Sequence, residues 1–217
     1  MTGRVVTDIP CSDITGVILA GGRGQRLGGA DKGLVPLLGK PLIEHVMAAL
    51  RPQVGRLVIS ANRNRETYAA YGVPVIADGI GDYHGPLAGI LSALRAAATP
   101  FVLSAPCDTP TPPSDLVERL IVALVREQAQ LAVVSCGARM QPVFALVHCA
   151  LAQPLQDYLA GGGREAGAWM RRQNAALADF SDVAEAFVNI NTPQELQDAA
   201  TGCAPPAPRD GGKTPSN

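Results

Sequence analysis

The chain has 217 residues, of which 47% are hydrophobic, and its 18 basic side chains nearly balance 19 acidic ones. This length and apolar content suffice for one domain with a full core and exclude a chain that is disordered throughout. The net charge of −1 excludes a general basic field for nucleic acid or for a membrane surface. No apolar run reaches the roughly 18 residues of a membrane span, and residues 1–14 lack the apolar segment of a signal peptide. We therefore expect a cytoplasmic protein without nucleic-acid or membrane partners.

Apolar runs and helical patterns alternate along the chain between two polar ends. We expect a flexible leader over residues 1–13, one folded domain over residues 14–203 and a disordered tail over residues 204–217. In the first half of the domain, continuously apolar runs predict strands buried on both faces, at residues 15–20, 56–61, 73–78 and 100–108. Periodic apolar faces predict helices between and after them, at residues 41–51, 64–71, 85–98 and 113–128.

The second half of the domain shows a different pattern. Two apolar runs, at residues 131–137 and 142–149, flank the sequence Gly-Ala-Arg-Met and predict an antiparallel hairpin. Two helical stretches follow, at residues 150–159 and 165–174. A short strand and a helix that is capped by Thr192 and begun by Pro193 end the domain.

Buried strands that alternate with helices predict an α/β fold. We expect a single doubly wound, mostly parallel Rossmann-like sheet with one antiparallel hairpin element. Ligands of such sheets bind beyond the carboxyl ends of the strands. A Gly-rich loop follows the first predicted strand, Asp78 follows the third and Asp108 follows the fourth. These three features are therefore expected along one rim of the sheet.

The loop reads VILAGGRGQRLGGADKG over residues 17–33. It fails the phosphate-loop pattern, because Ala30 stands where that pattern needs Lys, and it misses the dinucleotide-binding pattern at Leu27. A Gly-rich loop that follows a buried strand can nevertheless bind an anion through its free backbone N–H groups. Arg23, Arg26 and Lys32 would add the charge that a triphosphate needs. The alternative is a flexible surface loop without a ligand.

Several motifs together resemble the molybdenum cofactor guanylyltransferase family of nucleotidylyltransferases. The loop carries Leu-Ala-Gly-Gly-x-Gly-x-Arg-x-Gly and then Asp-Lys-Gly. Four later motifs follow in the family's order: GPLAG at residues 85–89, PCDTP at 106–110, DFSD at 179–182 and FVNINTPQEL at 187–196. The resemblance covers residues 15–199 and implies a magnesium-dependent enzyme with GTP and the molybdopterin-bound molybdenum cofactor as substrates.

The implied reaction transfers GMP from GTP to the terminal phosphate of the pterin and releases pyrophosphate. The attacking phosphate is an anion near neutral pH, so no general base is needed. The three histidines lie outside the shared motifs. Positioning of two anions and neutralisation of the leaving pyrophosphate would then carry the catalysis.

The resemblance implies roles for the residues around the loop. Asp108 would bind Mg²⁺, and Lys32 would contact the GTP phosphates. Arg26 would contact the β- or γ-phosphate of GTP or the pterin phosphate. The backbone of Leu19, Ala20 and Gly21 would contact the nucleotide. Gly22 would allow the phosphates to approach closely. The alternatives are a turn carboxylate for Asp108 and solvated surface cations for the other two side chains.

Other motif positions have expected nucleotide or phosphate contacts. Asn62 and Asp78 lie after the second and third strands, where the family contacts the nucleotide. Ser60 stands where the family often has Asn and could still form one hydrogen bond to the nucleotide, and the alternative is a strand-end hydroxyl without a ligand. Gly85 and Gly89 flank a helix start that would help to hold phosphate, and plain turn chemistry is the alternative for Gly85.

Residues near the end of the domain are candidates for contact with the second substrate. Asn189 and Asn191 would share one strand face and bind the pterin or a metal-bound phosphate. For Asn191 the alternative is a side chain that satisfies backbone groups before the next helix. Arg164 could meet the pterin phosphate or be a mobile surface cation. Cys107 is expected to point into the core, without a nucleophilic role.

Three other readings compete with guanylyl transfer. The nearest is another nucleotidylyltransferase, either the cytidylyl enzyme of the same pathway or one that acts on a sugar or isoprenoid phosphate. Leu-Ala-Gly-Gly at residues 19–22, where related cytidylyltransferases tend to have Leu-Ala-Ala-Gly, favours GTP. A non-catalytic nucleotide-binding protein is the second, and a GTPase switch is disfavoured by the failed phosphate-loop pattern. We expect a monomer that passes its product to molybdoenzymes or to other cofactor-synthesis proteins.

Overall fold

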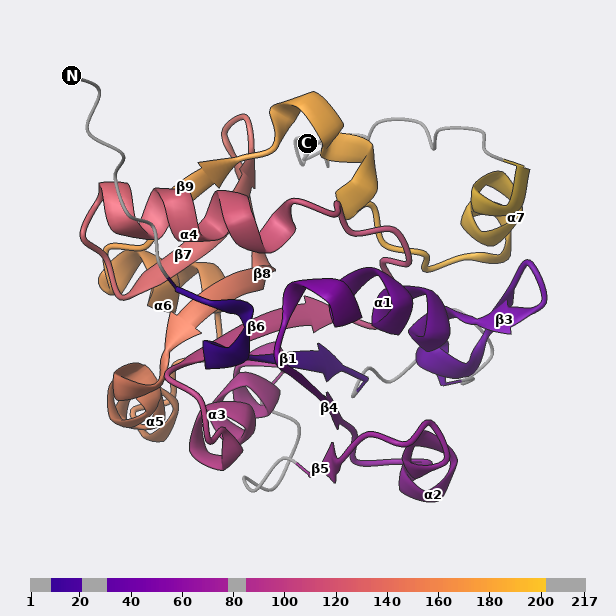
Figure 1. Cartoon of the computed structure of the whole chain (residues 1–217), viewed down its shortest axis with the longest axis horizontal. Helices are drawn as coiled ribbons and strands as arrows, with labels where there is room; N and C mark the ends of the chain where they lie inside the picture. The colour runs from indigo at the N-terminus through magenta and orange to yellow at the C-terminus, as the bar shows by residue number, and fades with distance from the viewer. Residues whose placement is uncertain (1–8, 21–30, 78–84, 202–217) are drawn as a thin grey trace, which may run out of the picture.

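The computed structural model describes residues 9–20, 31–77 and 85–201. Its main sheet is built from seven strands: β1 (Ile14–Leu19), β4 (Arg56–Ser60), β5 (Val75–Ile76), β6 (Phe101–Pro106), β7 (Leu131–Cys136), β8 (Arg139–His148) and β9 (Ala176–Asp179). Their order across the sheet is β5–β4–β1–β6–β8–β7–β9 (Figure 1). A second, two-stranded sheet pairs β2 (Pro36–Leu37) with β3 (Lys40–Pro41).

Only one strand of the main sheet runs against the others. β8 pairs antiparallel with both β6 and β7, whereas the remaining neighbours pair in parallel. β7 and β8 form the predicted hairpin, with a tight turn at Gly137. The expected α/β fold with a mostly parallel, Rossmann-like sheet and one antiparallel hairpin is therefore confirmed.

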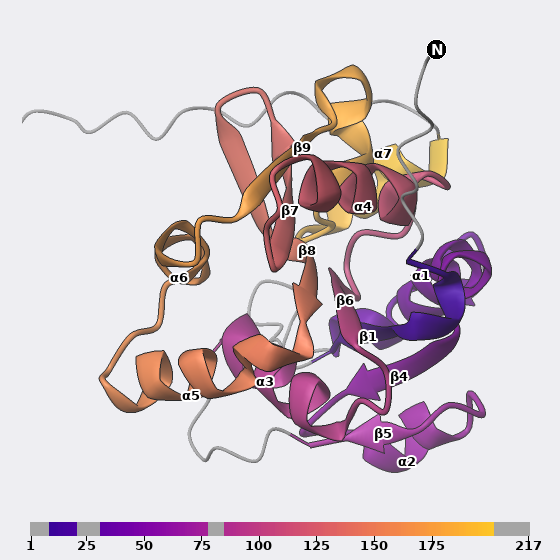
Figure 2. The same ribbon diagram turned by 60° about the vertical axis from the view of Figure 1, so that its left-hand side comes forward.

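Helices cover both faces of this sheet. The α-helices of the described residues are α1 (Leu42–Leu50), α2 (Arg65–Ala69), α3 (Pro86–Ala96), α4 (Leu116–Arg126), α5 (Ala152–Ala160), α6 (Ala166–Arg172) and α7 (Pro193–Thr201), of which α7 packs against Leu37 of the small sheet. Figure 2 shows α1 and α4 on one side of the strands and α3, α5 and α6 on the other. Ile18 of β1 packs in the core between the sheet and α1 and α4, whereas Val17 packs in the core between the sheet and α3, α5 and α6. Because both faces are covered, the central strands are apolar at almost every position.

Short 3₁₀ segments connect several of these elements. They are η1 (Cys11–Asp13), η3 (Lys32–Leu34), η4 (Arg51–Gln53), η5 (Cys149–Leu151) and η6 (Ser181–Phe187). No helix in the described part of the chain is long and apolar enough to cross a membrane.

The structure corrects two predictions about the last third of the chain. Residues 188–191 form no strand: the N–H of Ile190 donates to the carbonyl oxygen of Asp108 at 2.8 Å instead of joining a ladder. This bond reaches the chain beyond Pro106, where β6 ends, so it does not extend the sheet. In turn, β9 was not predicted, since it spans four residues and only alternate side chains are buried.

Candidate functional site

The register of the central strands places three strand ends side by side. Leu19, the last residue of β1, pairs with Ser60 of β4 on one side and with Pro106 of β6 on the other. The pairing continues past the strands, because Ala20 donates to the carbonyl oxygen of Ser60 at 2.8 Å and Cys107 donates to that of Leu19 at 3.2 Å. The segments that leave β1 and β6 therefore start at the same edge, as expected for a ligand site in a parallel sheet.

Lys32 lies at the centre of the polar groups at this edge. Its ammonium donates to Oδ2 of Asp108 at 2.8 Å and to Oδ1 of Asn191. The side chains of Lys32 and Asp108 are only 19% and 11% exposed. Three segments that are far apart in sequence thus meet in one partly buried cluster, which we call the Lys32 cluster: Lys32, Asp108 and Asn191. The structure brings together three predicted site residues.

The loop of residues 189–191 is fixed directly onto the end of β6. Thr109 donates its hydroxyl to Oδ1 of Asn189 at 2.8 Å, and the main chain of Ile190 bonds to that of Asp108. Asn189 and Asn191 therefore reach the site from a loop and not from a common strand face, which corrects the predicted arrangement. Thr109 was not singled out from the sequence, although it lies within the PCDTP motif.

A capping box at the start of α7 directs the side chain of Asn191 toward Lys32. The Glu195 carboxylate accepts from the N–H groups of Asn191 at 2.6 Å and of Thr192 at 2.9 Å, while Thr192 Oγ1 accepts from the Glu195 N–H at 3.2 Å. Thr192 is the predicted cap. The alternative for Asn191 is present as well, because its amide nitrogen donates to the carbonyl oxygen of Asn189 at 3.3 Å, while its amide oxygen accepts from Lys32.

The predicted nucleotide-contact residues lie in different settings. Ser60 is buried at the end of β4, and Asn62 is exposed just beyond it. Gly85 precedes α3 with φ of +69°, a conformation that favours glycine, so the predicted turn role is present. Gly89 is buried within α3. Gly21, Gly22, Arg26 and Asp78 lie outside the described residues.

Cys107 and Arg164 are occupied in other ways. Cys107 is 5% exposed, and burial together with the nearby Asp108 and Asp31 charges raises the pKa of its thiol well above the usual range. The prediction that it points into the core is confirmed, and a protonated thiol is a poor nucleophile. Arg164 donates to the carbonyl oxygens of Leu159 at 2.8 Å and Gly163 at 2.7 Å, so its guanidinium holds the end of α5.

The donor set of the Lys32 cluster fits a hard cation. The described residues contain no group of three or more His, Cys, Asp or Glu side chains that could hold a metal by themselves. Mg²⁺, however, is usually held by one or two carboxylates together with substrate phosphates. A carboxylate oxygen of Asp108 and an amide oxygen of Asn191 already converge on one positive group, the Lys32 ammonium. The arrangement thus provides oxygen ligands of the kind that Mg²⁺ prefers.

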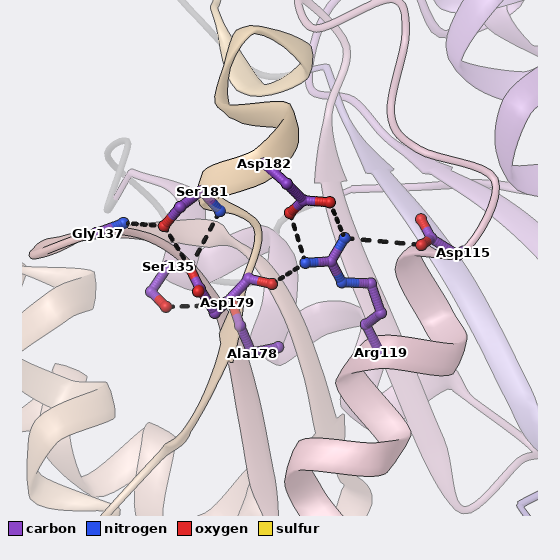
Figure 3. A network of polar contacts seen from close by, with 8 residues as sticks. All are labelled: Asp115, Arg119, Ser135, Gly137, Ala178, Asp179, Ser181 and Asp182. Carbon is purple, nitrogen blue, oxygen red and sulfur yellow. Dashed lines mark hydrogen bonds and ion pairs between the residues drawn. The ribbon is translucent and has the colours of Figure 1, made fainter.

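A second polar network lies on the other half of the sheet and joins α4 to β9 and η6 (Figure 3). The guanidinium of Arg119 donates to both carboxylate oxygens of Asp182, at 3.1 and 2.8 Å, and to the carbonyl oxygen of Asp179. It also lies 3.9 Å from the centroid of the Phe180 ring and 3.7 Å from Asp115. We call this set the Arg119 cluster. Its groups bind one another across α4, β9 and η6, which is a structural arrangement.

Comparison with known proteins identifies relatives of the whole domain. The family model described as "MobA-like NTP transferase domain" matches residues 16–177. The chain is 47% identical over 201 residues to a protein of Ralstonia nicotianae named molybdenum cofactor guanylyltransferase, covering 88% of this chain and 98% of that protein. It is 50% identical over 190 residues to a protein of the same name from Cupriavidus taiwanensis, covering 85% and 95%.

A solved structure agrees with these sequence relatives. The crystal structure titled molybdopterin-guanine dinucleotide biosynthesis protein A, from Archaeoglobus fulgidus, superposes with a TM-score of 0.71 at 25% identity. The match covers 87% of this chain and 98% of that one. The chain therefore shares its fold with that protein over most of its length.

Proposed function

Because the chain belongs to the MobA-like NTP transferase family and is a nucleotidyltransferase, we propose that it transfers GMP from GTP to the terminal phosphate of molybdopterin-bound molybdenum cofactor. The names of the relatives support this choice of substrates. The single structural observation that supports it best is the Lys32 cluster, where a cation and two oxygen ligands meet at the carboxyl ends of β1 and β6.

The proposed reaction needs no general base, because the attacking phosphate is already an anion. An oxygen of the pterin phosphate forms a bond to the α-phosphorus of GTP, and the bond from that phosphorus to the bridging oxygen breaks. Pyrophosphate leaves with the bonding electrons. Lys32 would neutralise phosphate charge, while Asp108 and Asn191 would orient the Lys32 ammonium. Cys107, the buried thiol beside Asp108, stays protonated and takes no part.

A divalent cation completes the proposed site. Asp108 and Asn191 would hold Mg²⁺ together with phosphate oxygens, and the ion, when bound, would offset the charge that develops on the leaving pyrophosphate. Arg26, Gly21, Gly22, Ser60, Asn62 and Asp78 complete the proposed nucleotide contacts, with the roles that the sequence resemblance implies for them.

The proposal includes the setting of the enzyme. The nucleotidyltransferase domain occupies residues 14–203, and the match to the family model over residues 16–177 supports this. The enzyme acts as a monomer in the cytoplasm and passes its product to molybdoenzymes or to other proteins of cofactor synthesis. Analytical ultracentrifugation tests whether the enzyme is a monomer, and copurification tests whether it binds the proteins that receive its product.

The direct test offers GTP, CTP, ATP and UTP separately to the purified protein with molybdenum cofactor and Mg²⁺. Pyrophosphate and the dinucleotide product are measured. GTP-dependent release that Asp108→Ala abolishes and that the control Asp157→Asn in α5 retains supports the proposal. Turnover with CTP would contradict the choice of substrate, whereas tight GTP binding without pyrophosphate from any nucleotide would contradict the activity.

A further inference from the structure

We propose that Tyr68 is a positioning residue for Lys32: its hydroxyl fixes the backbone on both sides of Lys32 and thereby sets where the ammonium lies. This inference rests on the proposed function, which assigns a phosphate contact to Lys32. Tyr68 belongs to α2 and precedes β5, and no sequence motif considered above includes it.

The first contact is with the residue before Lys32. The Tyr68 hydroxyl donates to Oδ1 of Asp31, and Asn64 Nδ2 donates to Oδ2 of the same carboxylate at 2.9 Å. Asn64 adopts a left-handed conformation with φ of +50° at the start of α2, and its carbonyl oxygen accepts from the Tyr68 N–H at 3.0 Å. Both oxygens of Asp31 are therefore bound by side chains from one turn of α2.

The second contact is with the residue after Lys32. Gly33 is buried, and a Cβ placed on it would lie 2.5 Å from the Tyr68 hydroxyl oxygen and 3.4 Å from Cβ of Cys107. The hydroxyl thus occupies the space that a side chain at position 33 would need. Because the aromatic ring is rigid and fully buried, this contact fixes the distance between α2 and the backbone of η3.

These two contacts leave the Lys32 side chain little freedom at its base. The backbone is closed further by hydrogen bonds from Leu34 to the Asp31 carbonyl oxygen at 3.0 Å and from Val35 to that of Lys32 at 3.1 Å. From this fixed base the side chain extends to Asp108 and Asn191. Preorganisation of this kind lowers the cost of holding a catalytic group in place.

The Tyr68 hydroxyl acts here as a permanent donor. Burial raises the pKa of Tyr68 far above its usual value, and the hydrogen bond to Asp31 raises it further. The hydroxyl therefore stays protonated near neutral pH. The hydroxyl therefore does not exchange protons with substrate. Its influence on the reaction runs through Asp31 and Gly33 to Lys32.

A double-mutant cycle tests this inference. Tyr68→Phe, Lys32→Met and the double variant are compared by single-turnover GMP transfer and by GTP affinity, with melting temperatures to confirm that each is folded. Tyr68→Phe should lower kcat about 10-fold, with a smaller change in KM, because a misplacement of about 1 Å can cost up to 100-fold. In the Lys32→Met background the same change should have no further effect. Equal effects in both backgrounds would show a purely structural role and overturn the inference.

A second pair of variants uses the geometry at Gly33. Gly33→Ala should lower transfer because its methyl group meets the Tyr68 oxygen, and Gly33→Ala with Tyr68→Phe should be more active than Gly33→Ala alone. Tyr71→Phe, the same change three residues further along the chain, is the control. A double variant no better than Gly33→Ala would contradict the proposed contact.

The two readouts separate this inference from the proposed function. A wild type that transfers no nucleotide, but whose GTP affinity shows the same non-additive cycle, would overturn the reaction and support the role of Tyr68. An active wild type with additive effects would overturn the role of Tyr68 alone. A wild type that neither transfers nor binds GTP would overturn both.

Discussion

The Lys32 cluster and the Arg119 cluster use the same chemistry in different surroundings. Each holds a cation between oxygen acceptors from distant segments. The side chains of Lys32 and Asp108 are 19% and 11% exposed, whereas those of Arg119 and Asp182 are 28% and 63% exposed. Arg119 is also bidentate and stacked on Phe180, a geometry that suits a lasting structural contact.

The difference separates the ion pair that we propose to be functional from the one that joins two parts of the fold. The Lys32 ammonium is a compact charge on a flexible stem, at the edge where parallel strands end and ligands bind. It can exchange its oxygen partners for a phosphate or share them with a metal. Arg119 uses both terminal nitrogens to hold η6 and β9 against α4, and we expect it to keep these partners during a reaction. Four predictions, made with three variants, test this distinction in order of decreasing expected effect.

Removing the carboxylate of the Lys32 cluster should have the largest effect. We expect Asp108→Ala to lower the rate of nucleotidyl transfer by about 10³-fold, since one preorganised electrostatic partner in an active site is typically worth 10² to 10³. Single-turnover transfer of GMP at saturating GTP measures this. Arg119→Met is the matched control, because it removes one partner of the other ion pair. Equal losses in the two variants would contradict the distinction between the clusters.

Loss of the α7 capping box should affect the site through Asn191. Glu195→Ala removes the acceptor of two N–H groups and should cost about 1 kcal/mol of stability, as for other helix caps. Because Asn191 then loses its fixed backbone, transfer should fall by about 10-fold. Chemical denaturation and single-turnover kinetics measure the two effects. Gln194→Ala, one residue earlier in the same turn, is the control. Unchanged transfer would mean that the capping box does not position Asn191.

Breaking the Arg119 cluster should lower stability and spare the reaction. Arg119→Met keeps much of the apolar stem over Phe180 and loses the charged contacts, which contribute little to stability when the groups are this exposed. The midpoint of urea denaturation should fall, while transfer should stay within about threefold of the wild type. A loss of transfer as large as that of Asp108→Ala would make the Arg119 cluster part of the site.

The smallest effect is a pH dependence of the same contact. The hydrogen bonds from Arg119 lower the pKa of the Asp182 carboxyl below its usual 3.8. A lowered pKa adds stability that is complete above the unfolded-state pKa and is lost as the pH falls through the folded-state value. The difference in Tm between wild type and Arg119→Met should be constant above about pH 5 and shrink between about pH 4 and pH 2. A difference that grows on acidification would contradict this assignment.

Much of the fold could be predicted because its strands and helices give strong local signals. The buried strands of the first half and the hairpin of β7 and β8 are apolar runs bounded by turn residues. β9 escaped prediction because its outward-facing Leu177 is 45% exposed and the run is only four residues long. The predicted strand over residues 188–191 was wrong for a different reason: the alternating pattern is real, but the segment meets the chain beyond the end of β6, through the bond from Ile190 to Asp108.

The sequence placed the Gly-rich loop and Asp108 along one rim of the sheet, but it did not predict which side chains of the Lys32 cluster contact one another. Lys32 and Asp108 lie in motifs that the sequence shows, but their contact spans 76 residues and depends on the register between β1 and β6. Glu195 had a readable signal, since Thr192 and Glu195 have the spacing of a capping box. Tyr68 had none, because an apolar position on a short helix predicts only a core side chain.

The fate of each phosphate of GTP tests the central claim most directly. The wild type is incubated with Mg²⁺, molybdenum cofactor and GTP labelled at either the α- or the γ-phosphorus, and Lys32→Met is treated in parallel. The account predicts that the α label enters the dinucleotide product, that the γ label leaves in pyrophosphate, and that Lys32→Met slows both. Release of the γ label as inorganic phosphate, with no α label in the product, would contradict nucleotidyl transfer.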